Sequence, residues 1–195
     1  MIRPEPKALW RKGQPELWSK AGAVCNENEV WTKGFAPQTI EWEEGVKFRL
    51  RMWQESKHLG LFPEQEPHWR WIRENITKGD KVLNLFAYTG SASLVAAKAG
   101  AAVTHVDASG PAVQGARDNA EASGLKEAPI RWIVEDVMTY LKREEKRGSF
   151  YEGILLDPPS FGRGPKGQLW KIEAVAELLE QCARVLSKKP KFVLL

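Results

Sequence analysis

Three apolar runs of this chain each end in residues that could bind a ligand or carry out chemistry. The runs and the loops that follow them are residues 81–94, 103–109 and 153–161. Each has the pattern of a buried parallel strand followed by a loop. The first loop offers Gly90, the second Asp107, and the third Asp157 with two prolines. Because open α/β sheets bind ligands at the carboxyl ends of their strands, we expect these loops to form one site.

Alternating strands and helices must hold these loops in place. The predicted strands are 81–86, 102–106, 130–134, 153–156 and 191–195, and the predicted helices are 91–99, 111–123, 137–147 and 168–187. Gly100 and Gly124 follow two of the helices, where C-cap glycines are common. Repeated strand–helix units predict an α/β fold with a doubly wound, Rossmann-like parallel sheet.

A different pattern precedes the sheet. Apolar and polar residues alternate between residues 29 and 53, with glycine and proline between the runs, which predicts a small antiparallel β unit. Pro67 then suits the first turn of a helix. We expect an N-terminal β-rich segment at residues 1–62 and a ligand-binding domain at residues 63–195.

The composition narrows the class of protein. With 195 residues, 43% of them hydrophobic, the chain can bury the core of one domain with an appendage. It has no apolar run that could span a bilayer, and residues 1–12 are polar and charged, so we expect a cytoplasmic protein without a membrane partner. Cys25 and Cys182 lack metal-ligand spacing, which indicates reduced thiols and no metal site.

Taken in order, three motifs resemble those of class I S-adenosylmethionine-dependent methyltransferases. They are Asn-Leu-Phe-Ala-Tyr-Thr-Gly at 84–90, Asp107, and Asp-Pro-Pro-Ser-Phe at 157–161. The chain resembles one group more closely, the bacterial large-subunit ribosomal RNA cytosine-5 methyltransferases and their uncharacterised relatives, from Asn28 to Leu195. The resemblance implies S-adenosylmethionine as cofactor and methyl transfer to a base of ribosomal RNA.

The first loop also distinguishes between nucleotide cofactors. A dinucleotide site needs three glycines in a G-x-G-x-x-G pattern, whereas residues 86–91 contain one, which disfavours a nicotinamide-dependent oxidoreductase. S-adenosylmethionine has no phosphate, so one tight turn suffices. Asp107 is placed to accept hydrogen bonds from the ribose hydroxyls and Asp136 from the adenine amine, although such aspartates often serve as caps or turn formers. By resemblance, the other cofactor contacts are Asn84, Phe86, Tyr88, Thr89, Gly90 and Gln65, of which Gln65 could instead cap the following helix.

The segment after the third apolar run carries the predicted catalytic residues. Pro158 and Pro159 fix the backbone and remove two donors, so their carbonyls could point outward beside the methyl donor. Asp157 would accept a hydrogen bond from the substrate base or orient the loop, and Phe161 would stack on a flipped base. Ser160 separates Phe161 from the prolines, which departs from the usual pattern of amino-methylating enzymes.

RNA is the predicted partner, although the charge is only +4. Arg163, Lys166 and Lys171 follow the catalytic segment and suit a polyanionic substrate, and they suit an ordinary solvated surface equally well. The nine tryptophans permit base stacking, but core packing explains most tryptophans. The oligomeric state is not indicated.

Methylation at carbon 5 of cytosine needs a thiolate. In the resembling enzymes this cysteine follows the fifth of seven strands. The sequence predicts five strands and therefore a chain truncated at its C-terminus, with the cysteine beyond Leu195. Cys182 lies on an apolar helix and suggests core packing. Besides an RNA methyltransferase, the alternatives are a catalytically silent module that binds cofactor and RNA, or a methyltransferase with another substrate.

Overall fold

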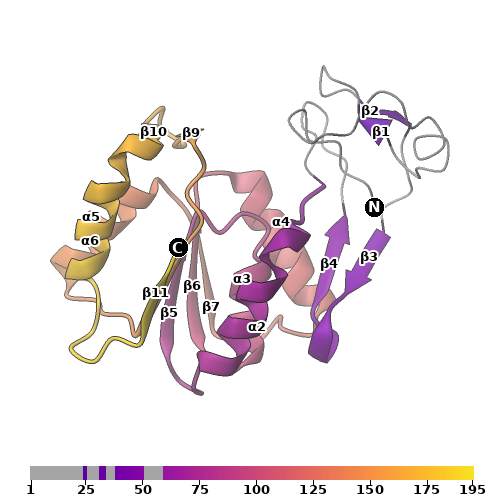
Figure 1. Cartoon of the computed structure of the whole chain (residues 1–195), viewed down its shortest axis with the longest axis horizontal. Helices are drawn as coiled ribbons and strands as arrows, with labels where there is room; N and C mark the ends of the chain where they lie inside the picture. Colours follow the sequence, from indigo (N-terminus) through magenta and orange to yellow (C-terminus); the bar gives the residue numbers. More distant parts are fainter. Residues whose placement is uncertain (1–23, 26–30, 34–37, 51–58) are drawn as a thin grey trace.

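Five parallel strands form the centre of the computed structural model, which describes residues 24–25, 31–33, 38–50 and 59–195 (Figure 1). The strand order is β11, β8, β5, β6, β7, and every neighbouring pair is parallel. The bounds are Lys81–Leu85 for β5, Ala102–Asp107 for β6, Ile130–Val134 for β7, Gly153–Leu156 for β8 and Phe192–Leu194 for β11. The predicted doubly wound α/β sheet is confirmed.

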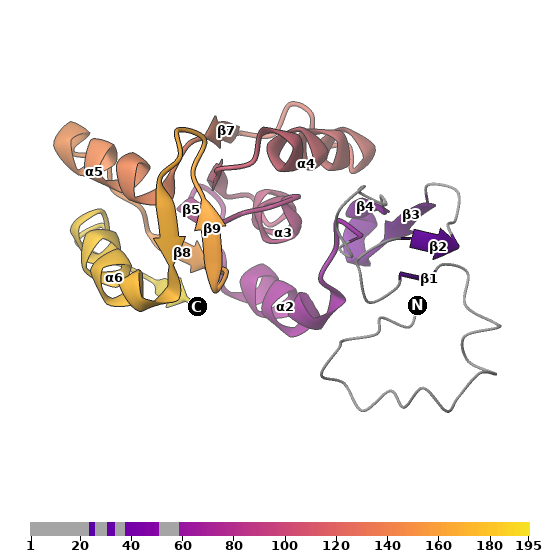
Figure 2. The ribbon, with the colours of Figure 1, turned by 90° about the horizontal axis from the view of Figure 1, so that it is seen from above.

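Helices cover both faces of the sheet (Figures 1 and 2). One layer consists of α2 (Glu66–Asn75), α3 (Ser91–Lys98) and α4 (Gly110–Ala122), and the other of α5 (Val137–Arg147) and α6 (Val175–Arg184). Successive strand residues point to opposite faces, so Val82 joins the core under the first layer and Leu83 the core under the second. Burial on both faces explains why these strands are almost continuously apolar.

An antiparallel hairpin packs beside the first helical layer. It consists of β3 (Gln38–Glu41) and β4 (Lys47–Leu50), while β1 (Val24–Cys25) pairs with β2 (Trp31–Lys33). Phe48 of β4 is buried, and its ring centroid lies 5.2 Å from that of Trp69 on α2. The predicted antiparallel β unit is therefore confirmed, and its apolar side extends the core of the sheet.

One predicted helix, residues 168–187, is wrong in its first part. Residues 161–171 instead form a hairpin of β9 (Phe161–Arg163) and β10 (Leu169–Lys171), and after the short helix η3 (Ile172–Ala174) α6 begins at Val175. Gly167 adopts a φ of 82°, and the Gly164 amide donates to the Gln168 carbonyl at 2.7 Å, which closes the turn. Glycine supplies this left-handed conformation without steric cost, and the turn replaces the first helical turns.

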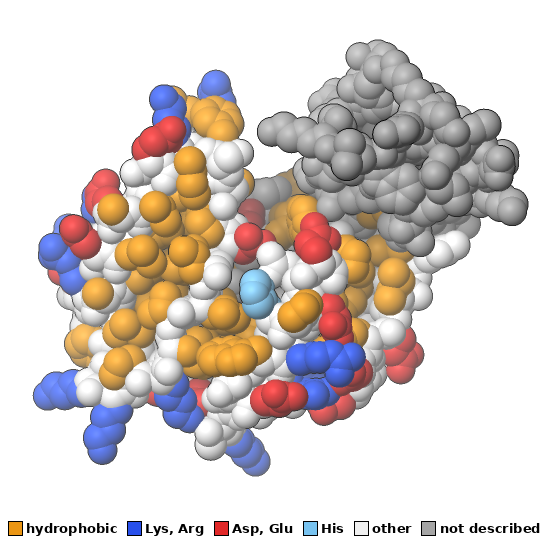
Figure 3. Space-filling model, in the orientation of Figure 1, with side chains coloured by type: hydrophobic (Ala, Val, Ile, Leu, Met, Phe, Trp, Pro, Cys, Tyr) orange, Lys and Arg blue, Asp and Glu red, His pale blue; other side chains and the backbone are white. Residues whose placement is uncertain are grey.

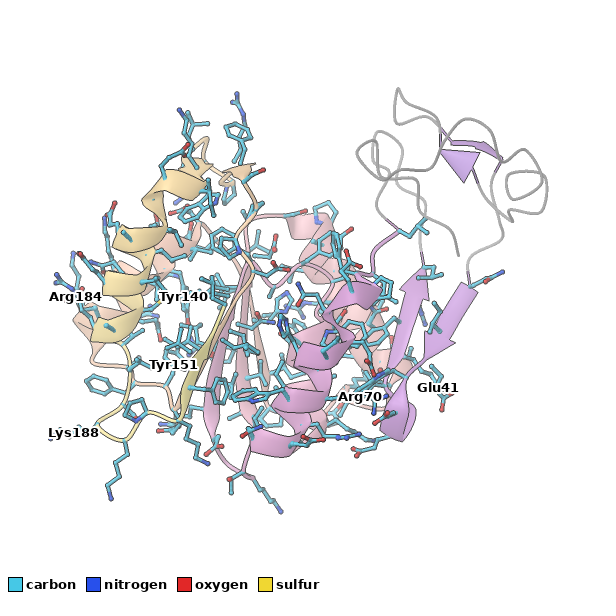
Figure 4. All side chains as sticks on the ribbon, viewed as in Figure 1. Glu41, Arg70, Tyr140, Tyr151, Arg184 and Lys188 are labelled. Carbon is cyan, nitrogen blue, oxygen red and sulfur yellow. The ribbon has the colours of Figure 1, made fainter. Side chains whose placement is uncertain are left out.

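A buried polar cluster fixes the second helical layer to the sheet. The Tyr151 hydroxyl donates to Glu144 Oε2 at 2.8 Å, and Arg147 pairs with Glu144 Oε1 at 2.9 Å. Figure 4 shows Tyr140 and Tyr151 between the helices and the sheet. Their hydroxyl oxygens lie 3.3 Å apart. Pairing is what makes a buried carboxylate tolerable.

In the described part of the chain, no helix is both long and apolar enough to cross a membrane.

Candidate active site

A cavity opens where β5 and β8 end and α2 begins. Among the predicted site residues, it brings together Gln65, Asn84, Phe86, Tyr88, Thr89, Gly90 and Asp157. Its lining does not include Asp107, Asp136, Pro158, Pro159 or Phe161. The cavity measures about 90 Å³, whereas sites for cofactor-sized molecules measure roughly 300–1,000 Å³. Most of a bound molecule would therefore extend over the neighbouring strand ends, where Asp107 and Asp136 lie.

The loop after β5 has an unusual backbone. Phe86, Tyr88 and Gly90 have φ values of 56°, 49° and 86°, so three of five consecutive residues are left-handed. This conformation costs free energy at the two aromatic residues, and such strain concentrates at functional sites. The Thr89 hydroxyl donates to the Gly60 carbonyl at 2.5 Å, which ties the loop to the segment before α2.

Asp107 holds this loop from the end of β6. Its Oδ2 accepts the Tyr88 N–H at 2.7 Å, and its Oδ1 accepts the Ser109 N–H at 2.8 Å. Burial raises the pKa of this carboxyl group. Each carboxylate oxygen can accept more than one hydrogen bond, so the group can hold the loop and still accept a pair of ligand hydroxyls. These acceptor oxygens therefore fit the ribose hydroxyls of S-adenosylmethionine.

Replacing Asp107 with alanine should weaken binding of S-adenosylhomocysteine by about 1–3 kcal/mol, because a charge-assisted hydrogen bond is lost. The two amide contacts add a structural effect, and we expect the free energy of unfolding to fall by about 1–3 kcal/mol. Isothermal titration and urea denaturation measure the two effects. Glu121→Ala, on an exposed carboxylate of α4, should change neither. An unchanged affinity in the Asp107 variant would contradict the ribose assignment.

Asp136 caps helix α5. Its Oδ1 accepts the Thr139 N–H at 2.8 Å and the Thr139 hydroxyl at 2.7 Å. The cap that sequence reasoning weighed against an adenine contact is therefore present. Among the hydrogen bonds of the described residues, none ends on Asp136 Oδ2, so the capping role leaves one oxygen for an amine donor.

Gln65 connects α2 to the end of β8. Its Nε2 donates to Asp157 Oδ2 at 3.4 Å, and its Oε1 contacts Nδ1 of His68. Burial raises the pKa of Asp157, and nearby His68 opposes this shift. Sequence reasoning missed His68, although its position three residues after Gln65 on a helix was a usable signal.

The proline pair contacts the β9–β10 hairpin. Trp170 is 7% exposed, its Nε1 donates to the Pro159 carbonyl at 2.7 Å, and its ring centroid lies 4.9 Å from that of Phe86. The expectation of an outward carbonyl is therefore wrong at Pro159, because a buried indole N–H takes that acceptor. Trp170 was also missed, since the predicted helix concealed its role.

A buried polar chain lies under the loop. Asn84 Nδ2 donates to Ser93 Oγ at 2.9 Å, and Ser93 Oγ lies 3.0 Å from His105 Nδ1. The His105 ring packs 4.9 Å from Trp132. Asn84 thus orients the end of β5 from within the core. The sequence signal for this buried polar chain was a histidine, His105, inside the apolar run of β6.

His105 should make stability depend on pH. Burial, with Arg117 nearby, lowers its pKa to about 3, whereas an unfolded histidine titrates near 6.5. The unfolded state therefore binds the extra proton, and stability is lost as pH falls below about 6.5, by roughly 1.4 kcal/mol per unit. Urea denaturation from pH 7.5 to 4.5 should show this loss relative to His105→Asn, which keeps an acceptor for Ser93. If the unfolding free energies of the parent chain and of His105→Asn changed equally with pH, the proposed role of His105 would be contradicted.

Asn119 joins the loop to the N-terminal hairpin. Its Nδ2 donates to the Thr89 carbonyl at 3.1 Å, and its Oδ1 accepts the Arg49 N–H at 2.9 Å. One turn further along α4, Ser123 Oγ accepts the Lys47 N–H at 2.8 Å. Side chains of α4 and of its C-cap residue thus bind backbone N–H groups of β4, and one buried amide contacts both β4 and the loop.

A nucleophilic thiolate is not available from Cys182. The side chain is 1% exposed, and burial raises its pKa to about 12. This agrees with the expected core role. Among the described residues, no group of three or more His, Cys, Asp or Glu side chains could hold a metal ion.

Comparison with known proteins gives consistent matches. The family model of S-adenosylmethionine-dependent methyltransferases matches residues 24–185. A curated relative, ribosomal RNA large subunit methyltransferase I of Shewanella denitrificans, is 39% identical over 126 residues, which are 64% of this chain and 31% of the relative. The chain therefore spans about a third of that relative's length.

Solved structures agree with these matches. The S-adenosylmethionine-dependent methyltransferase of Agrobacterium tumefaciens is 42% identical, with a TM-score of 0.84 over 90% of this chain and 59% of that one. A second solved structure, which is a complex with SAH, is 28% identical, with a TM-score of 0.70 over 80% of this chain and 41% of that one.

Proposed function

The chain belongs to the S-adenosylmethionine-dependent methyltransferases, and we propose that it takes part in methyl transfer to RNA, specifically to a base of ribosomal RNA. The observation that carries the proposal is one cavity shared by the strained loop after β5 and by Asp157 after β8. The loop proposed to bind the cofactor and the carboxylate proposed to contact the substrate are therefore neighbours. The curated relative named as a ribosomal RNA methyltransferase supports the choice of substrate.

Several residues of the chain would hold the cofactor. S-adenosylmethionine, when bound, supplies an activated methyl group. Asp107 would accept hydrogen bonds from the ribose hydroxyls, Asp136 would accept one from the adenine amine, and the backbone of residues 86–90 would form the adjoining wall. Gln65 and His68 close the cavity from α2. Asp157 lines the same cavity, where its carboxylate would orient the acceptor base or take up a proton.

The surface beside the cavity suits a polyanion. The sequence has no acidic residue between Asp157 and Glu173, while Arg163, Lys166 and Lys171 lie in that interval. All three cations are exposed and belong to the β9–β10 hairpin or its turn. Electrostatic attraction of this kind favours RNA over a neutral substrate.

Transfer of tritiated methyl groups tests the proposal. Incubated with S-adenosyl-[methyl-³H]methionine and undermethylated ribosomal RNA, the chain should label RNA, and S-adenosylhomocysteine should inhibit the reaction. Labelling of added protein but not RNA would point to another substrate. Cofactor binding without any transfer would favour the catalytically silent module.

A further inference from the structure

The β9–β10 hairpin, residues 161–171, has two different faces. Directly opposed residues of an antiparallel pair lie on the same side, and successive residues alternate. One face carries the pair Gly162 and Trp170. The other face carries the pairs Phe161 with Lys171 and Arg163 with Leu169.

The first face is fixed to the wall of the cavity. Trp170 contacts the Phe86 ring, which lines the cavity, and donates to the Pro159 carbonyl. At the base of the hairpin, the Ile172 N–H donates to the Ser160 carbonyl at 3.1 Å. The position of the outer face relative to the cavity is therefore set by packing.

The outer face combines apolar and cationic side chains. Phe161 and Leu169 are 53% and 60% exposed, and each faces a basic residue across the hairpin. Lys166 adds a third cation in the turn. Figure 3 shows hydrophobic and basic side chains together, with acidic side chains beside them, where Figure 1 labels β9 and β10. An exposed aromatic ring among cations matches the needs of an unpaired nucleotide, which offers a base to stack and a phosphate to pair.

We propose that this outer face binds single-stranded RNA, with an unpaired base stacked on Phe161 and Leu169 and phosphates held by Arg163 and Lys171. The inference rests on the proposed function and deepens it. Because Phe161 does not line the cavity, the stacked base flanks the methylated one. The hairpin therefore selects unpaired RNA beside the target, rather than holding the target itself.

Fluorescence anisotropy with a labelled single-stranded oligoribonucleotide and its duplex tests this assignment. Phe161→Leu should lower affinity for the single strand by roughly tenfold, as expected for loss of one stacked base, and leave duplex binding unchanged. Phe150→Leu is the matched control, because Phe150 is 52% exposed and precedes β8, at the opposite end of that strand from Asp157. It should change neither affinity.

Charge reversal provides a second measurement. The double variant Arg163→Glu, Lys171→Glu should flatten the dependence of log affinity on log salt by roughly 1.4, whereas Lys188→Glu, Lys189→Glu should not. If the parent chain bound single-stranded RNA and both hairpin variants matched it, the hairpin assignment would be overturned and the RNA substrate would stand. A parent chain that bound no RNA would overturn both proposals. Equal competition by an acidic peptide would reassign the face to a protein partner.

Discussion

Replacing Asp157 with alanine should lower the single-turnover rate of methyl transfer by about 10²–10³-fold, the usual effect of removing one group that acts on the transition state. Affinity for S-adenosylhomocysteine should change by no more than about twofold, because Asp107 and the loop after β5 remain. Asp157 lines the cavity and accepts a hydrogen bond from Gln65, so it is held in place before a substrate arrives.

Glu152→Gln is a matched control for this experiment. Glu152 precedes β8 as Asp157 follows it, and its Oε2 accepts the Lys81 N–H at 2.8 Å at the other end of the sheet. It should leave the transfer rate unchanged. Equal loss in both variants would mean that the sheet, and not the site, was damaged. If Asp157→Ala transferred methyl groups at the parental rate, the segment of residues 157–161 would have only a structural role.

Gly90→Ala should weaken binding of S-adenosylhomocysteine about 100-fold. A Cβ at this position would lie 2.9 Å from Ala116 Cβ, and the φ of 86° disfavours any side chain. If the loop relaxes to relieve about 2.7 kcal/mol of strain, its binding-competent fraction falls to roughly 1% and the apparent affinity falls equally. Isothermal titration measures this directly.

Gly79→Ala separates the effect of the steric clash from the effect of the positive φ. Gly79 has a φ of 92°, but nothing lies within 4 Å of the added Cβ. It should cost about 1 kcal/mol of unfolding free energy and leave cofactor affinity unchanged, while Gly90→Ala should cost about 2–4 kcal/mol. Normal affinity in Gly90→Ala would show that the loop geometry does not determine binding.

Much of the site could be predicted from sequence because parallel strands end at one edge. Asn84 lies near the end of β5 and Asp157 directly follows the neighbouring strand β8, so the strand pattern alone brought them together. The family motifs then placed Tyr88 and Gly90 in the same loop. Local order in the sequence was sufficient for these residues.

The remaining features depend on contacts between distant segments. Trp170 meets Pro159 only because a hairpin replaces the predicted helix, and the turn that causes this depends on one left-handed glycine. Asn119 contacts β4 across 70 residues of sequence, a pairing that no local pattern indicates. Phe161 likewise lies outside the cavity lining, because the register of the hairpin places it on the face opposite to Trp170.

Binding of S-adenosylhomocysteine to this chain tests the central claim most directly. Isothermal titration should give one binding site per chain, with affinity about 100-fold weaker in Gly90→Ala and reduced in Asp107→Ala, and with no heat from reduced nicotinamide dinucleotide. Saturable one-to-one binding with that dependence would establish the cofactor site at the carboxyl ends of β5 and β6. Absence of binding by the folded parent chain, or binding that both variants retain in full, would contradict it.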